Sequence, residues 1–380
     1  DPLPQGCIAA GDRAFFCAYA MQYLARAGLS EEDVARNGYL IRTTLDPKVQ
    51  DSVKNAVDEV ADPPTAVGVA SVMSVIRPGK DAHRILAMAD SRTYGLDLNA
   101  GQTVQPQPFS LVGDGAGSIF KIFTTAAALE MGGLGINAKL DVPQTFRGTG
   151  LGDSTEPGCP PKTWCVKNVS GFASQLNVTD ALAKSPNTAF AKLIAQIGVP
   201  PRAMDMAVRL GLRSYAEPGD RPRVRPPETN ESIADWVKRQ NLGSFTLGPL
   251  ELNALELTNV AATLASGGMW CPPSPIDKVI DRHGGEVALD TAPCEQAVPR
   301  GTRQHDGQCA RQGPHRRNRY QRRGLGRMGS ADGGQDRHHR VTPVVGIPRL
   351  HQPVRRRELH LQRLPPDAVR SVLVPAASVQ

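Results

Sequence analysis

A change of composition at Pro299 limits what this chain of 380 residues can fold into. Residues 1–299 hold 27 Lys and Arg against 32 Asp and Glu, whereas residues 300–380 hold 17 Arg, no Lys and five acids. The net charge therefore changes from −5 to +12, and the only aromatic residue of the later segment is Tyr320. Because this segment has little apolar periodicity, we expect it to be largely disordered or poorly packed. The core must then come from residues 1–299.

The overall composition excludes a membrane-spanning segment. Hydrophobic residues make up 40% of the chain and the mean hydropathy is −0.30, which is typical of a chain that can bury a core in water. No run approaches the roughly 20 apolar residues that a membrane span needs. The chain begins at Asp1 without a charged and then apolar leader, so we expect a fragment or a processed chain.

The cysteines before Pro299 fall into three pairs that are close in sequence and lie around Gly- and Pro-rich loops. This arrangement predicts disulfides and an oxidising compartment. The alternative is six free or metal-bound thiols, but no C-x-x-C spacing or His cluster supports zinc. A seventh, Cys309, has no partner. The predicted pairs are Cys7–Cys17, Cys159–Cys165 and Cys271–Cys294.

Apolar periodicity predicts an α+β domain with helices against one antiparallel sheet. Two apolar runs around the turn at residues 79–81 predict a β-hairpin, and a second hairpin is predicted around residues 282–285. Residues 95–117 and 141–176 are expected to be mostly loop. Thr179-Asp180 is expected to cap a short helix. The predicted helices cover residues 13–29, 45–61, 118–132, 181–185, 187–198 and 250–266, with a short strand over 39–46.

Ser118 and Lys121 form an S-x-x-K sequence at the predicted start of a helix, where they share one face a turn apart. A serine hydroxyl becomes a nucleophile when a base takes its proton, and a desolvated lysine can do this. Backbone N–H groups at the helix start can help to hold an oxyanion. The tetrad by itself fits an N-cap serine and a solvated lysine at least as well.

Ser185-Pro186-Asn187 follows 67 residues after Ser118, between two predicted helices. A short loop at this place can present a second hydroxyl and an amide to the first site. The hydroxyl would relay a proton to a leaving amine, and the amide would hold a peptide carbonyl or orient the lysine. The alternative is that Ser185 and Asn187 only cap the following helix.

Together, the order, spacing and flanks of these sequences resemble the transpeptidase domain of penicillin-binding proteins. The resembling stretches are GAGSIFKIFT, KSPNTAFAKLIAQIG and SFTLGPLELNALELTNVAATLASGG, and RTTLDPKVQDSVKNAV is similar to the segment that joins the two domains of bifunctional class A members, actinobacterial ones most of all. The resemblance covers residues 35–299. It implies the α+β penicillin-binding-protein/β-lactamase-like transpeptidase fold, with an inter-domain linker at 1–60, a truncated transpeptidase domain at 61–299 and a tail at 300–380.

The resemblance also implies a chemistry. Ser118 would attack the D-Ala-D-Ala carbonyl of a peptidoglycan stem peptide, with Lys121 as base, Ser185 as proton relay and Asn187 positioning the substrate amide. β-Lactam antibiotics would acylate the same serine. The family implies no cofactor, no metal and no specific nucleic acid. It implies a place outside the cytoplasm in the cell envelope, with a membrane anchor and a glycosyltransferase domain in a missing N-terminal part.

One element of the family pattern is absent from this sequence. The family has a Lys-Thr-Gly strand beside the nucleophile, which supplies a cation for the substrate carboxylate and backbone for the oxyanion hole. No Lys-Thr-Gly occurs in the chain. A reading of the coding DNA that starts one base later than the present frame permits the sequence Lys-Thr-Gly-Thr-Thr at residues 335–339. The same shift permits a helical sequence from Arg300 and a strand-like sequence at 341–349. We therefore expect that the tail is out of frame and that the chain is impaired as an enzyme.

Three alternatives remain open. Arg316-Arg317, Arg322-Arg323 and Arg355-Arg356-Arg357 would suit a genuine basic tail for an anionic partner. A serine β-lactamase would need a carboxylate that activates the deacylating water, and Glu228 is the candidate at a suitable distance in sequence. A non-catalytic fragment that binds penicillin without turnover is the third. Turnover of a chromogenic cephalosporin separates the β-lactamase from the transpeptidase.

Overall fold

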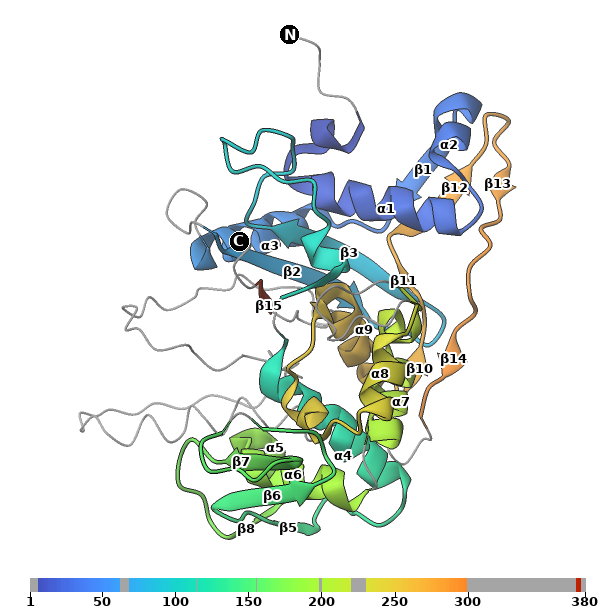
Figure 1. Cartoon of the computed structure of the whole chain (residues 1–380). Coiled ribbons are helices and arrows are strands. Elements are labelled where there is room, and N and C mark those ends of the chain that lie inside the picture. The colour runs from blue at the N-terminus through green and yellow to red at the C-terminus, as the bar shows by residue number, and fades with distance from the viewer. Residues whose placement is uncertain are drawn as a thin grey trace, which may run out of the picture.

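The computed structural model describes residues 6–61, 68–113, 115–154, 156–197, 200–219, 230–298 and 374–376 (Figure 1). Glu228, Cys309 and the out-of-frame stretch expected at 335–349 lie outside these ranges. The predictions made for these positions therefore stay predictions.

The helices of the described residues occur in the order of the predicted pattern, with three more, one at residues 31–37 and two between residues 200 and 239. They are α1 (Ala14–Arg26), α2 (Glu31–Asn37), α3 (Pro47–Val60), α4 (Lys121–Glu130), α5 (Val178–Lys184), α6 (Asn187–Gln196), α7 (Pro200–Leu210), α8 (Ile233–Arg239) and α9 (Ala254–Ala265). Short 3-10 helices are η1 (Gly6–Arg13), η2 (Gln107–Phe109), η3 (Gly117–Phe120), η4 (Arg213–Ala216) and η5 (Gly243–Leu247).

The strands form one four-stranded sheet, one three-stranded sheet and several two-stranded pairs. The four-stranded sheet has the order β11 (Pro273–Ser274), β3 (His83–Asp90), β2 (Ala70–Arg77) and β15 (Val374–Ala376). The three-stranded sheet joins β1 (Leu40–Thr43), β12 (Ile276–Ile280) and β13 (Glu286–Val287). The pairs are β4 (Leu111–Val112) with β9 (Leu252–Asn253), β5 (Lys139–Asp141) with β8 (Gln175–Asn177), β6 (Thr145–Thr149) with β7 (Thr163–Lys167), and β10 (Met269–Trp270) with β14 (Glu295–Gln296).

The β2–β3 hairpin separates two layers of helix. Side chains alternate across a strand, so each strand supplies both faces. Met73 and Val75 pack with the apolar stripe of α3, whereas Ile76 and Ile85 pack with α1 and α9. Residues of β2 and β3 are buried almost throughout, because helices cover both faces of the hairpin (Figure 1). This is the α+β class that the sequence predicts, but the prediction of a single antiparallel sheet was wrong, because β11 pairs with β3 in parallel and a separate three-stranded sheet is present.

The largest core lies below this sheet and surrounds α4. Phe120 and Phe123 are fully buried and pack edge-to-face, and Phe245 from η5 packs against Phe120. Helices α5, α6, α7, α8 and α9 contribute to this core, and β5 to β8, which form a small outer layer near α6, add side chains from outside (Figure 1). The core therefore encloses the start of α4, where the S-x-x-K sequence lies.

Several local predictions need correction. Residues 141–176 are mostly loop, as expected, but they also contain β6 and β7 and the paired ends of β5 and β8, which were not predicted. The cap of α5 is Asn177, whose side chain accepts from the backbone N–H of Asp180, and not Thr179-Asp180. The long helix begins at Lys121, because Ser118 lies in the 3-10 turn η3.

The three predicted disulfides are present in the structure. The Cα separations are 5.5 Å for Cys7–Cys17, 6.0 Å for Cys159–Cys165 and 4.2 Å for Cys271–Cys294, all below the roughly 7 Å that would exclude a bridge. Over the described ranges, no helix combines the length and the apolar character that crossing a membrane requires. No group of His, Cys, Asp and Glu in those ranges is arranged to hold a metal ion.

Candidate active site

A close backbone contact fixes the turn that carries Ser118. Gly117 has φ of +62° and donates its N–H to the carbonyl of Gly248 at 3.0 Å. Gly248 also has positive φ, and a Cβ atom there would lie 2.3 Å from the carbonyl oxygen of Gly117. The loop after η5 can approach the Ser118 turn only because position 248 has no side chain. Ser118 is thus presented half-buried at the start of α4.

Ser185 is the C-cap of α5 and has left-handed backbone angles, φ 62° and ψ 44°. This conformation costs a non-glycine residue about 1–2 kcal/mol, because Cβ crowds the backbone. The next residue, Pro186, turns the chain into α6, which starts at Asn187. The left-handed turn brings the hydroxyl of Ser185 and the amide of Asn187 to the same side as the start of α4.

The left-handed backbone of Ser185 leads to a stability prediction. We expect the free energy of unfolding of Ser185→Gly to be about 1 kcal/mol higher than that of Ser185→Ala. Both variants lack the hydroxyl, but only alanine has a Cβ atom that is strained at left-handed backbone angles. Thermal unfolding should show a melting temperature about 2–4 °C higher for the glycine variant. The same pair of changes at Ser52, inside α3, should give the opposite order. If Ser185→Ala is as stable as Ser185→Gly, the left-handed backbone at position 185 is not strained and the prediction is wrong.

The structure brings the four predicted site residues together around one amine. The Nζ atom of Lys121 lies 3.0 Å from Ser118 Oγ, 2.8 Å from Ser185 Oγ and 2.9 Å from Asn187 Oδ1. It also lies 2.9 Å from the backbone carbonyl oxygen of Ser185. Residues that are up to 69 positions apart in sequence thus meet within hydrogen-bonding reach, and neither Ser185 nor Asn187 acts as a helix cap through its side chain.

The partners of the amine can satisfy its neutral form. A lysine ammonium has three hydrogens and no lone pair, whereas a neutral amine has two hydrogens and one lone pair. The carbonyl oxygen of Ser185 and the Oδ1 atom of Asn187 can only accept, so they take the two hydrogens of a neutral amine. The lone pair is then free to accept a proton from a serine hydroxyl. Ser118 and Ser185 are both placed to donate one.

Burial changes the proton affinity of the same amine. Lys121 is 1% exposed, and desolvation lowers the pKa of its amine from the ordinary 10.5 to about 7. The cause is that a buried ammonium loses the hydration that stabilises its charge. A lysine with this pKa is a neutral base in a large fraction of molecules near pH 7. This is the property that a general base for a serine nucleophile needs.

The start of α6 is held from outside by Asn168, which follows β7. Pro186 is the N-cap residue and its side chain makes no capping bond, so the first N–H groups of α6 need another acceptor. The N–H of Thr188 donates to Asn168 Oδ1 at 3.1 Å, and Asn168 Nδ2 donates to Thr188 Oγ1 at 2.8 Å. Asn168 therefore caps α6 from 20 residues away and fixes the position of Asn187. The sequence gives no signal for this contact.

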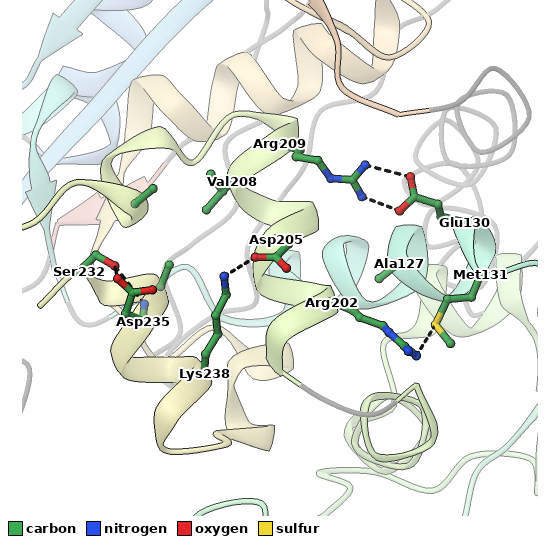
Figure 2. Close-up of a pocket in the computed structure, with 12 residues that line it drawn as sticks. Ala127, Glu130, Met131, Arg202, Asp205, Val208, Arg209, Ser232, Asp235 and Lys238 are labelled. Atoms are coloured by element: carbon green, nitrogen blue, oxygen red, sulfur yellow. Dashed lines mark hydrogen bonds and ion pairs between the residues drawn. The ribbon is translucent and has the colours of Figure 1, made fainter.

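A separate cavity of about 740 Å³ lies at the other end of α4 (Figure 2). Four of its charged side chains pair with one another, Arg209 with Glu130 and Lys238 with Asp205, and Arg202 donates to the carbonyl oxygen of Ile197. Its serine, Ser232, is occupied in capping α8 through Asp235. None of the four predicted site residues lines it. We therefore place the candidate active site at Ser118 and not in this cavity.

Comparison with known proteins adds evidence on the family and the fold of the chain. Residues 82–306 match the family described as the penicillin binding protein transpeptidase domain. The chain is 25% identical over 283 residues to penicillin-binding protein 1A of Mycobacterium tuberculosis, and 27% identical over 263 residues to the peptidoglycan D,D-transpeptidase PbpA of Mycolicibacterium smegmatis. These alignments cover 72% and 63% of this chain, and 29% and 48% of the relatives. The chain thus spans less than half the length of these two curated relatives.

Solved structures show the same fold. The PonA1 protein of M. tuberculosis in complex with penicillin V superposes with a TM-score of 0.57 at 21% identity, over 79% of this chain and 71% of that one. The imipenem acyl-enzyme complex of penicillin-binding protein A from the same organism gives a TM-score of 0.51 at 22% identity, over 71% and 62%. At these identities the likeness is one of fold.

Proposed function

Because the chain belongs to the penicillin-binding protein transpeptidase domain family, we propose that it is the transpeptidase part of a peptidoglycan D,D-transpeptidase that acts through an acyl-serine at Ser118. The observation that carries this proposal is the Lys121 amine, buried and 3.0 Å from Ser118 Oγ, with Ser185 and Asn187 as its other partners. The proposed domain is residues 61–299, preceded by a linker at 1–60.

In the proposed reaction, the neutral amine of Lys121 takes the proton of Ser118 Oγ as this oxygen forms a bond to the D-Ala-D-Ala carbonyl carbon. The bond from this carbon to the terminal D-Ala nitrogen then breaks, and Ser185 relays the proton held by Lys121 to the departing amine. Asn187 holds the amide of the stem peptide. An amine from a second stem peptide attacks the acyl-serine and releases Ser118. A β-lactam opens on the same serine, which forms an ester that persists.

The test is covalent labelling by a fluorescent penicillin in excess over several hours, with the adduct located by peptide mass spectrometry. We expect one adduct per chain, on the peptide that contains Ser118, and none in Ser118→Ala. Ser110→Ala, in the same loop region, serves as the control and should label like the parent chain. Repeated turnover of a chromogenic cephalosporin would instead indicate a β-lactamase. The absence of any adduct, both in this chain and in a chain read one base later after Pro299, would refute the proposal.

The pKa of Lys121 predicts how labelling depends on pH. The amine acts as base only when neutral, so lowering the pH below about 7 protonates it and slows acylation. We expect the second-order rate constant to fall about tenfold per pH unit below this value and to level off above it. Stopped-time labelling between pH 5.5 and 9 measures this profile. A rate that is constant across the range would show that Lys121 is not the base.

The proposed setting is the cell envelope, outside the cytoplasm. Three disulfides in the structure fit an oxidising compartment. The proposed partners are peptidoglycan stem peptides and β-lactam antibiotics, and a membrane anchor would belong to a longer parent protein. The out-of-frame tail is part of the proposal, because the family's Lys-Thr-Gly does not occur in this sequence.

A further inference from the structure

An aromatic ring lies beside the amine of Lys121. The Nζ atom is 5.4 Å from the centroid of the Phe190 ring, a distance at which a cation interacts with the face of an aromatic ring. Both side chains are buried, Lys121 at 1% and Phe190 at 0% exposure. Phe190 lies three residues after Asn187 on α6, so the ring and the Asn187 amide share one face of the helix. One helix therefore supplies two groups to the same amine.

No carboxylate among the described residues is available to the amine. All four of its hydrogen-bond partners are neutral oxygens of Ser118, Ser185 and Asn187. The charged side chains on the helices packed against α4 lie elsewhere or are paired elsewhere, and desolvation is the cause of the shift at Lys121. On α5 these charged groups are Asp180 and Lys184, and on α6 the group is Lys192, which pairs with Asp141 of β5. On α7 they are Arg202, Asp205, which pairs with Lys238 of α8, and Arg209, which pairs with Glu130 of α4.

This arrangement leaves a problem that the ring can solve. When Lys121 takes the proton of Ser118, a positive charge appears in a buried site that holds only neutral acceptors. A carboxylate would stabilise the charge, but it would also keep the resting lysine protonated and unable to act as a base. A ring face stabilises a buried cation more weakly, so it helps the ammonium that forms without preventing the neutral resting state.

We propose that Phe190 is a positioning residue whose ring face stabilises the ammonium form of Lys121 as Ser118 becomes acylated. The inference deepens the proposed function and rests on it for the acylation step. The proton moves from Ser118 Oγ to Lys121 Nζ while the serine oxygen bonds to the acyl carbon. The ring takes no part in bond making, and it acts through the charge of the amine.

The first experiment measures the amine directly in the chain as it exists. The ε-carbons of the 11 lysines are labelled with ¹³C, the Lys121 signal is identified by its loss in Lys121→Met, and its pH titration is followed by NMR. Phe190→Leu removes the ring face, so the midpoint should move down by about half a unit to one unit. Phe123→Leu is the matched control, because Phe123 is equally buried but packs against Phe120 and Phe245. It should leave the midpoint unchanged.

A second variant avoids the loss of packing in Phe190→Leu. Trifluorophenylalanine incorporated at position 190 keeps the shape of the ring and withdraws charge from its face, so the Lys121 midpoint should again fall. An unchanged or raised midpoint in either Phe190 variant would overturn the inference.

Penicillin labelling then separates the two proposals. If penicillin acylates Ser118, the midpoint of the plot of labelling rate constant against pH should shift to lower pH in the Phe190 variants, by the same amount as the NMR midpoint. The rate constant on the high-pH plateau should also be lower than in the parent. A profile that does not move while the NMR midpoint does would overturn the role in acylation. A shifted NMR midpoint without labelling of any variant would refute the proposed function and still support the contact between ring and ammonium.

Discussion

Restoring the shifted reading frame after Pro299 is expected to raise the rate of Ser118 labelling by a fluorescent penicillin on the order of 100- to 1000-fold or more. In the variant gene one base is deleted after the codon for Pro299. Translation then continues in the shifted frame, which permits Lys-Thr-Gly at the position of residues 335–337. In the family that the chain belongs to, this strand supplies one donor of the oxyanion hole and the cation that faces the substrate carboxylate. Loss of one oxyanion donor alone typically costs a factor of this size.

A chain that ends at Pro299 is the control for this experiment. If the present tail contributes nothing to acylation, the truncated chain should label as slowly as the full chain. The quantity to compare is the second-order rate constant, measured at equal concentrations of folded protein. Equal rate constants for the present and the restored chain would show that residues 300–380 are not an out-of-frame form of the missing strand.

Lys121→Met, made in the restored frame, is expected to lower the acylation rate constant by about 100- to 10,000-fold, because general-base catalysis contributes a factor in this range. The side chain is of similar length and keeps the packing, but it has no lone pair on nitrogen to accept the proton of Ser118. The change also leaves the carbonyl oxygen of Ser185 and the Oδ1 atom of Asn187 without their hydrogen-bond donor, so the melting temperature should fall by a few degrees. Rate constants measured on the folded variant, well below its melting temperature, separate chemistry from folding.

The matched control for this change is Lys192→Met. Lys192 lies on α6, and its ion pair with Asp141 is largely at the surface, so its loss should change stability by less than about 1 kcal/mol. The acylation rate constant should stay within a factor of two of the parent. If Lys121→Met labels as fast as Lys192→Met, another group must be the base.

The parts of the fold with strong local signals were predictable from the sequence. The β2–β3 hairpin follows from two long apolar runs around a Gly79 turn, and α3 follows from its amphipathic spacing after the Asp46 cap. The strands between residues 139 and 177 were missed because they are three to five residues long and lie among glycines and prolines. The pairing of β5 with β8 joins ends more than 30 residues apart, which no local pattern reveals.

The candidate site was predictable as a set of residues, while its electrostatics needed the structure. The S-x-x-K and S-x-N sequences name Ser118, Lys121, Ser185 and Asn187, but their meeting at one amine depends on the packing of α4 against α6. Sequence reasoning missed Phe190 and Asn168. Phe190 could have been found from its i+3 spacing to Asn187 on a helix. Asn168 acts across a loop, and nothing in the spacing points to it.

Because the backbone of Ser185 is left-handed, thermal stability and catalysis favour different residues at position 185. A library sorted only for survival at high temperature would favour glycine there, because glycine adopts these angles without strain. The winning clones would have lost the hydroxyl that lies 2.8 Å from Lys121 Nζ. Lineages that keep a serine at this place would accordingly be under selection for something other than persistence of the fold. Position 185 is therefore the place in this chain where a stabilising screen and an activity screen should diverge most sharply.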